Sequence, residues 1–274
     1  MKVPARGLVF DVDVRGQADA PPVLLLHGFP QTSHCWRLLL PHLKGFRTIA
    51  PDQRGYSPAA RPEGIDAYRV PELVADPLAI LDELGVEKAH VVGHDWGAAV
   101  AWQLGARHPD RVTTLTILSV PHPRAFIEAL RTDDDQRSKS LYMRDFARDG
   151  YADELLADDA TPMRSMFGGL PEVHVDEYVA RAQEPGALAA WLRWYAAQDL
   201  EDIGDTPAVA VPTLYAWSDG DVALGRSAAE ATAEWVTGPY RFAVLEGVTH
   251  WIPEQAADTL GPLLNEHLGP AQAH

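Results

Sequence analysis

The sequence predicts an α/β fold with a mostly parallel central sheet, helices on both faces and a helical insertion between two of its strands. Short apolar strand patterns alternate with helical patterns over more than the first hundred residues. Between about residues 123 and 205 the strand patterns stop, and charged and aromatic residues recur at helical spacing. Two strand patterns and one helical pattern then return before the chain ends.

The strands are predicted from short apolar or alternating runs. Residues 10–14 alternate apolar and polar side chains, as a half-exposed strand does. Residues 23–26 are continuously apolar, which is typical of a strand buried on both faces. The same criteria predict strands at residues 46–50, 89–92, 112–120, 213–217 and 241–245.

The helices are predicted from periodicity and from their stop signals. Residues 36–43, 98–106 and 254–267 have helical patterns. Residues 71–84 form an amphipathic pattern that ends at Gly85. Pro77 lies inside it and removes a backbone donor, so we expect a kink or a regular helix only in the second half.

These patterns divide the chain into two parts. We interpret residues 123–205 as a helical lid domain, and residues 1–122 with 206–274 as the core domain that carries the sheet. The tail from residue 269 to 274 is expected to be unstructured.

Composition excludes several classes of partner. The 274 residues are 46% hydrophobic, which is enough for a sizeable core, and the net charge of -16 argues against nucleic acid and anionic membranes. No apolar run is long enough for a membrane helix, and no signal peptide is visible at the N-terminus. Cys35 is the single cysteine, so no intrachain disulfide can form. We therefore expect a cytoplasmic globular protein.

A glycine-flanked aspartate is the candidate nucleophile. Residues 93–97 read Gly-His-Asp-Trp-Gly, between a predicted buried strand and an alanine-rich helix. A sharp strand-to-helix turn needs small flanking residues and holds its central residue, Asp95, at a helix N-terminus that favours a carboxylate. The plainer interpretation is that this pentapeptide is only a turn.

An aspartate nucleophile restricts the chemistry. Its carboxylate is ionised at neutral pH and can attack an sp3 carbon, giving an alkyl-enzyme ester that water must then hydrolyse. His250 follows the last predicted strand and is the candidate base, although a surface histidine is the alternative. Two carboxylates, Asp221 and Asp219, follow the preceding strand and compete as the partner of His250; the family resemblance described next implies Asp221.

In chain order, Asp95, Asp221 and His250 resemble the α/β-hydrolase superfamily. The resemblance runs from about residue 9 to 268, and is to the branch with an aspartate nucleophile, which contains epoxide hydrolases, haloalkane dehalogenases and fluoroacetate dehalogenases. Residues 27–30, His-Gly-Phe-Pro, resemble the His-Gly-x-Pro motif of epoxide hydrolases. This implies an oxyanion hole from the amides of Phe29 and Trp96. Substrate contacts are expected from His27, Phe29, Pro30, Trp36 and Trp96.

Two tyrosines of the insertion are candidate acids. Helical spacing at i, i+3, i+4 and i+7 joins Leu188, Trp191, Leu192 and Tyr195. Tyr195 with the preceding tryptophan resembles the second lid tyrosine of epoxide hydrolases, and residues 141–143 resemble the segment that holds the first, which implies Tyr142. Tyr151 and Tyr178 compete with Tyr142 for that role. Alternatively, the tyrosines only pack the lid against the core.

The resemblance favours epoxide over halide chemistry. Phe29 stands where many dehalogenases have a halide-binding Asn or Glu, and Trp96 and Ala99 stand where fluoroacetate dehalogenases have arginines. The family resemblance implies an epoxide hydrolase that forms a vicinal diol from an apolar or aromatic epoxide. A haloalkane dehalogenase is the alternative, followed by a non-catalytic ligand-binding homologue. No metal or organic cofactor is expected, and the chain would be a monomer or homodimer.

Overall fold

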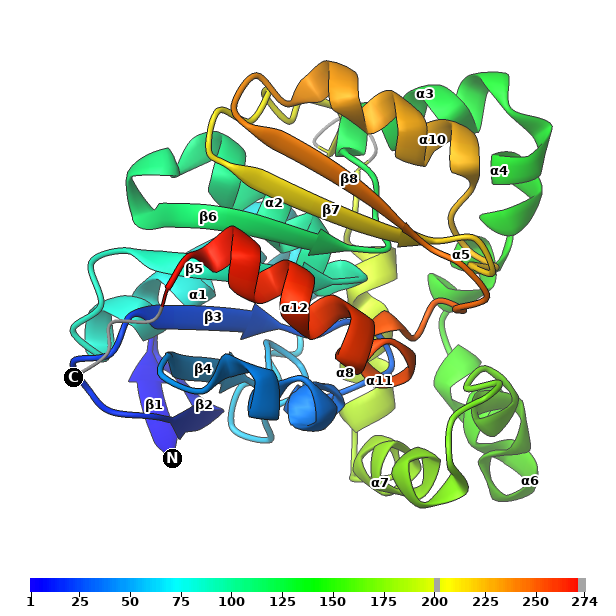
Figure 1. The fold of residues 1–274 in the computed structure, drawn as a ribbon. Coiled ribbons are helices and arrows are strands. Elements are labelled where there is room, and N and C mark those ends of the chain that lie inside the picture. Colours follow the sequence, from blue (N-terminus) through cyan, green and yellow to red (C-terminus); the bar gives the residue numbers. More distant parts are fainter. Residues whose placement is uncertain (200–202, 271–274) are drawn as a thin grey trace.

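The computed structural model describes residues 1–199 and 203–270, which contain an eight-stranded sheet with the order β1-β2-β4-β3-β5-β6-β7-β8 (Figure 1). The strands β1 and β2 pair antiparallel with their neighbours, and the other pairings are parallel. The prediction of a mostly parallel sheet is confirmed. The strands are β1 (Lys2–Ala5), β2 (Leu8–Arg15), β3 (Pro22–Leu26), β4 (Arg47–Pro51), β5 (Ala89–His94), β6 (Val112–Leu118), β7 (Thr213–Ser218) and β8 (Tyr240–Leu245).

Helices cover both faces of this sheet. Figure 1 shows α12 (Ala257–Leu268) on the near face and α1 (Val70–Glu83) and α2 (Trp96–Arg107) on the far face. The helix α2 packs against β5 and β6, and α1 packs against α2 and β1. Two short helices complete the C-terminal part, α10 (Arg226–Ala231) and α11 (Ile252–Gln255).

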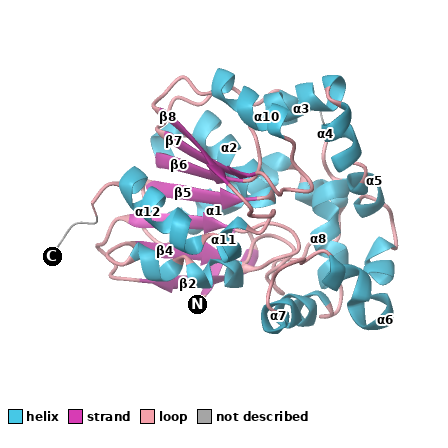
Figure 2. Ribbon diagram, turned by 45° about the vertical axis from the view of Figure 1, so that its right-hand side comes forward, coloured by secondary structure: helices cyan, strands magenta, loops and turns pink. Residues whose placement is uncertain are grey.

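Helices occupy the segment between β6 and β7. Figures 1 and 2 show α5, α6, α7 and α8 beyond the carboxyl ends of the parallel strands, whereas α3 and α4 lie beside α10. The helix α6 is interrupted by non-helical backbone at residues 157–160. The helices are α3 (Pro123–Thr132), α4 (Asp134–Lys139), α5 (Tyr142–Phe146), α6 (Tyr151–Ser165), α7 (Glu172–Ala182) and α8 (Ala187–Ala196).

Several element predictions differ from the structure. The predicted helix at 36–43 is two 3-10 helices, Ser33–Leu38 and Leu40–Leu43, and Pro41 stands in the first turn of the second. The helix α1 begins at Val70 and includes Pro77, so it is not confined to the second half of the predicted pattern. The predicted C-terminal helix is divided at Ala256 into α11 and α12. The strand β1 had not been predicted, and residues 200–202 and 271–274, which include most of the predicted tail, lie outside the described residues.

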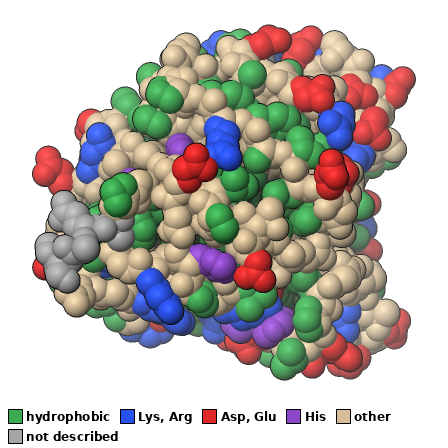
Figure 3. Space-filling view, viewed as in Figure 1, with side chains coloured by type: hydrophobic (Ala, Val, Ile, Leu, Met, Phe, Trp, Pro, Cys, Tyr) green, Lys and Arg blue, Asp and Glu red, His purple; other side chains and the backbone are tan. Residues whose placement is uncertain are grey.

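On the face in Figure 3, acidic and basic side chains are interspersed, and the basic ones form no continuous stripe. In the part of the chain that the structure describes, no helix combines the length and apolar character that crossing a bilayer demands.

Candidate active site

Asp95 occupies a sharp turn between β5 and α2. Its backbone has φ 51° and ψ -123°, a strained conformation for a residue with a side chain. A Cβ atom on Gly97 would overlap the carbonyl oxygens of Leu26 and His27, and one on Gly93 would overlap the Gly97 carbonyl. Both flanking glycines are therefore required by close packing of the turn against β3 and α2.

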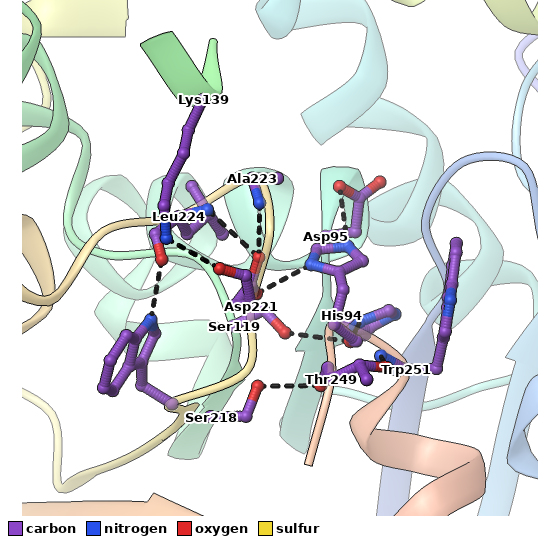
Figure 4. A network of polar contacts seen from close by, with 12 residues as sticks. His94, Asp95, Ser119, Lys139, Ser218, Asp221, Ala223, Leu224, Thr249 and Trp251 are labelled. Carbon is purple, nitrogen blue, oxygen red and sulfur yellow. Dashed lines mark hydrogen bonds and ion pairs between the residues drawn. The ribbon is translucent and has the colours of Figure 1, made fainter. Parts of the chain in front are cut away.

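The Asp95 carboxylate faces His250, which in turn contacts Asp221; the two aspartates are labelled in Figure 4. The His250 Nε2 atom lies 3.4 Å from Asp95 Oδ2, and its Nδ1 atom lies 2.8 Å from Asp221 Oδ2. The second Asp221 oxygen accepts hydrogen bonds from the amides of Ala223, at 2.8 Å, and Leu224, at 3.0 Å. These two amides fix the carboxylate, so it orients the imidazole.

Asp219, the competing carboxylate, is turned away from this group. It is exposed, and its Oδ1 atom accepts a hydrogen bond of 2.7 Å from the amide of Gly247. The backbone carbonyl of Asp221 is held separately by Lys139 Nζ, at 2.8 Å. The structure thus places Asp221 beside His250, whereas Asp219 joins the loop after β7 to the loop after β8.

The three groups form a charged chain. Burial alone would lower the pKa of His250, but the carboxylates of Asp221 and Asp95 raise it to about 10. Burial likewise opposes ionisation of Asp95, yet its hydrogen bond and attraction to His250 bring the pKa of Asp95 below its ordinary value. The two carboxylates therefore favour the protonated form of His250 in the resting site.

Two residues whose positions the sequence did not reveal support the His250 backbone. The carbonyl oxygen of His250 accepts hydrogen bonds from His94 Nε2, at 2.8 Å, and from Ser119 Oγ, at 3.2 Å. Because a carbonyl can only accept, His94 carries a proton on Nε2, and burial lowers its pKa to about 4. Ser119 has φ 71° just after β6, which no residue pattern had indicated.

The turn after β3 presents a backbone donor to the nucleophile. The amide of Phe29 donates a hydrogen bond of 2.7 Å to Asp95 Oδ1. A side chain on Gly28 would overlap the Asp95 side chain, so the two turns are in direct contact. Among the hydrogen bonds of the described residues, none joins the amide of Trp96, the second predicted donor, to this carboxylate.

His27 supports this turn through both ring nitrogens. Its Nε2 atom accepts from the amide of Gln53 at 3.2 Å, so Nδ1 carries the proton and donates to the Gly28 carbonyl at 3.1 Å. Burial lowers the pKa of His27 and keeps it neutral. The His27 residue is fully buried, and its predicted contact with substrate stays a prediction.

Tyr195 lies on the buried face of α8, as its spacing predicted. Its ring meets Trp96 and Phe29 edge-on, with centroids 5.1 and 5.3 Å away. Tyr142 on α5 lies 6.2 Å from Tyr195 by the same measure. Burial first, and then the charge of Asp95, raises the pKa of both phenols.

Aromatic packing fixes α8 on the core. Trp191 stacks on Tyr56 with centroids 4.6 Å apart, and Trp194 Nε1 donates to the carbonyl of Arg54 at 2.8 Å. Because these tryptophans are fully buried on the same helix as Tyr195, they determine where its phenol lies.

The competing tyrosines have other partners. The hydroxyl of Tyr178 donates to Glu254 Oε1 at 3.1 Å. Tyr151 packs on Phe146 and lies under the guanidinium of Arg148. Of the candidates for the first lid tyrosine, Tyr142 is the one whose ring contact with Tyr195 the structure gives.

The remaining predicted contacts line the interior. Pro30 and Trp36 are buried, and the indole nitrogen of Trp36 has no hydrogen-bond partner within the described ranges. The Asp95 side chain keeps 14% of its surface exposed. Residues 1–199 and 203–270 contain no group of three or more His, Cys, Asp or Glu suited to a metal ion.

Comparisons with known proteins agree with this geometry. A family model described as alpha/beta hydrolase fold matches residues 21–257. Epoxide hydrolase A of Mycobacterium tuberculosis is 33% identical, over 97% of this chain and 96% of that protein. The AB hydrolase superfamily protein YfhM of Bacillus subtilis is also 33% identical, with the same coverage.

Solved structures give the same answer. The crystal structure of Epoxide Hydrolase A from Mycobacterium thermoresistibile has a TM-score of 0.86 at 30% identity, covering 100% of this chain and 99% of that one. The epoxide hydrolase of Bacillus megaterium in complex with an inhibitor has a TM-score of 0.90 at 25% identity, covering 98% and 99%. The chain therefore belongs to the α/β-hydrolase superfamily, in its epoxide hydrolase family.

Proposed function

We propose that this protein converts an apolar or aromatic epoxide and water to a vicinal diol through a covalent ester on Asp95. One observation carries the proposal. The Asp95 carboxylate, on its strained turn, contacts the His250–Asp221 pair, and the two residues that flank the nucleophile, Trp96 and Phe29, contact the ring of Tyr195, which in turn contacts Tyr142. That set contains a nucleophile, a base and two proton donors.

In the first step the carboxylate attacks a ring carbon. Asp95 Oδ1 is held by the amide of Phe29, which leaves Oδ2 to form the new bond to carbon. The carbon–oxygen bond of the ring breaks, and the leaving oxygen takes a proton from Tyr195 or Tyr142. Because burial and the Asp95 charge raise the pKa of both phenols, both carry their protons at neutral pH.

In the second step water cleaves the ester. Alkylation removes the charge of Asp95, and with it part of what raises the pKa of His250. His250 then releases a proton, which replaces the one that the tyrosine gave, and takes another from water as it attacks the ester carbonyl. Negative charge develops on Oδ1, where the amide of Phe29 already lies. The diol oxygen leaves with the proton from His250, and Asp95 is restored.

The lid and the wider setting belong to the same proposal. Residues 123–205 would form the lid over the carboxyl ends of the strands, and residues 1–122 with 206–274 the core. The position of α5 to α8 supports this division. A cytoplasmic location, a monomeric or homodimeric state and independence from cofactors stay predictions from the sequence.

A substrate panel tests the reaction. Styrene oxide and dibromoalkanes are offered separately, and diol and bromide are measured. We expect diol from the epoxide without bromide release. Bromide release without epoxide turnover would instead identify a haloalkane dehalogenase, and tight binding without turnover of either would identify a binding protein.

A trapping experiment tests the covalent step. In His250→Gln the nucleophile remains while the base is lost, so styrene oxide should alkylate the protein and hydrolysis should stall. Intact mass should show one adduct, and peptide mapping should place it on Asp95. An adduct elsewhere, or none despite diol formation by the unmodified protein, would contradict the two-step mechanism.

A further inference from the structure

A second buried carboxylate lies close to the site and has no part in the mechanism above. Glu254 is on α11, four residues after His250, and its side chain is fully buried. Its Oε2 atom accepts a hydrogen bond from Gln31, and its Oε1 atom accepts from Arg37 and from the hydroxyl of Tyr178. Burial raises the pKa of Glu254, and Arg37 opposes that rise.

The three donors come from three different segments. Gln31 closes the turn that presents Phe29, since its own amide donates to the Gly28 carbonyl at 3.0 Å. Arg37 belongs to the 3-10 helix Ser33–Leu38. Tyr178 belongs to α7, beyond the carboxyl ends of the strands. One carboxylate therefore joins the segment that carries His250, the turn that carries Phe29 and the helical insertion.

We propose that Glu254 is a positioning residue for hydrolysis of the ester, an inference that rests on the function proposed above. It acts through Gln31, two residues after Phe29, and keeps the Phe29 amide at Asp95 Oδ1. Glu254 and His250 belong to one short segment. The contact between Glu254 and Gln31 therefore also fixes the Phe29 amide relative to His250.

The two half-reactions depend differently on this donor. During alkylation the negative charge of Asp95 is lost, so a hydrogen bond to Oδ1 weakens as the reaction proceeds. During hydrolysis the charge returns to Oδ1, so the same hydrogen bond strengthens in the transition state. A displaced Phe29 amide should therefore slow hydrolysis and leave alkylation almost unchanged.

The test separates the two steps in single-turnover experiments with styrene oxide. Gln31→Met keeps the size of the side chain and removes its hydrogen bond to Glu254. We expect hydrolysis to slow about tenfold or more, which is less than the roughly 10²-fold to 10³-fold loss that follows removal of a whole oxyanion donor, and alkylation to stay within about twofold. The alkyl-enzyme should then be the main species in intact-mass spectra during turnover.

A second variant tests whether Glu254 acts through Gln31. Glu254→Asp keeps the negative charge and draws the carboxylate back from its donors, Gln31 among them. If both residues act through one contact, hydrolysis in the double variant should be no slower than in the slower single variant. Independent, multiplicative losses would overturn the link between them.

A matched control separates positioning from general stability. Asp76 is another buried carboxylate, held by Arg54 at 2.6 Å and Arg6 at 2.9 Å on the far side of the sheet. Asp76→Asn should lower the Tm and leave the ratio of the two rate constants unchanged. Equal slowing of both steps in Gln31→Met would overturn the inference.

The proposed function is checked independently of this inference. The unmodified protein should form diol, and His250→Gln should give the Asp95 adduct. Failure of these two measurements would remove the proposed function itself. Success in both, with an unchanged ratio of rate constants in Gln31→Met, would remove only the role assigned to Glu254.

Discussion

The Nδ1 atom of His250 lies 2.8 Å from Asp221 Oδ2, while Asp219, two residues away, bonds to the amide of Gly247. Both carboxylates follow the same strand, β7, so the sequence left them as competitors. Two backbone amides donate hydrogen bonds to the buried carboxylate of Asp221, whereas Asp219 lies in the exposed turn. Only Asp221 can fix the tautomer of the imidazole.

Replacement of these two aspartates should therefore have unequal effects. Asp221→Asn should slow hydrolysis of the alkyl-enzyme on the order of 10³-fold to 10⁴-fold, as loss of the orienting carboxylate does in other triads. Asp219→Asn should change this rate less than about threefold. Single-turnover rates with styrene oxide check both. A larger loss in Asp219→Asn would show that the acid is misassigned.

The tyrosines are tested through the alkylation step. Tyr195→Phe and Tyr142→Phe each remove one proton donor and should slow alkylation about 10-fold to 100-fold, while the double variant should lose more. Tyr151→Phe serves as the control and should stay close to the unmodified rate. Rapid mixing with detection of the ester measures these rates. If Tyr151→Phe were slowed instead of Tyr142→Phe, the first lid tyrosine would be Tyr151.

The two steps should respond differently to pH. Alkylation needs ionised Asp95, whose pKa lies below its ordinary value, so this rate should hold down to strongly acidic pH. Hydrolysis needs neutral His250, whose pKa of about 10 in the resting protein falls once Asp95 is esterified. Its rate should rise with pH and level off. Single-turnover rates are measured for both steps as a function of pH. If hydrolysis persisted to the same pH as alkylation, or to a lower pH, the roles assigned to Asp95 and His250 would be contradicted.

Gly28 is the position where backbone approach matters most. A Cβ atom there would overlap the Asp95 side chain, so Gly28→Ala should abolish diol formation and destabilise the fold by about 1–3 kcal/mol through overpacking. Gly64→Ala is the matched control, since a Cβ atom there meets nothing within 4 Å. Diol assays and thermal unfolding compare the two. Full activity in Gly28→Ala would show that the turn after β3 can move away from Asp95 without loss of function.

Acid should destabilise the protein partly through His122. Burial lowers its pKa to about 4, and its Nδ1 atom accepts a hydrogen bond of 3.3 Å from the amide of Arg124. The unfolded chain takes up this proton near pH 6.5, so the contribution is complete above pH 6.5 and is lost as pH falls toward 4. His122→Asn should flatten the dependence of Tm on pH between about 6.5 and 4. An unchanged slope would exclude His122.

Much of the fold followed from the sequence because periodicity reports which faces are buried. The runs at residues 23–26 and 89–92 became β3 and β5, and the glycine-flanked turn between β5 and α2 held Asp95 as expected. The strand β1 was missed because it is a four-residue edge strand without a continuous apolar run.

What the sequence could not show were contacts between distant segments. Glu254 meets Gln31 across 223 positions, and Lys139 meets the Asp221 carbonyl across 82. A lone polar residue gives no sign of its partner, because hydrogen bonding depends on tertiary geometry and leaves no periodic pattern. The left-handed backbone of Ser119 was equally invisible, since serine at that place reads as the end of a strand.

At Ser119, stability of the fold and support of His250 favour different residues. A left-handed residue with a side chain costs roughly 1–2 kcal/mol, and glycine would recover much of this. Yet glycine would also delete the hydroxyl that holds the backbone of His250. A selection of substitutions by Tm alone would favour Ser119→Gly, although this substitution removes a support of His250 and would lower the catalytic rate.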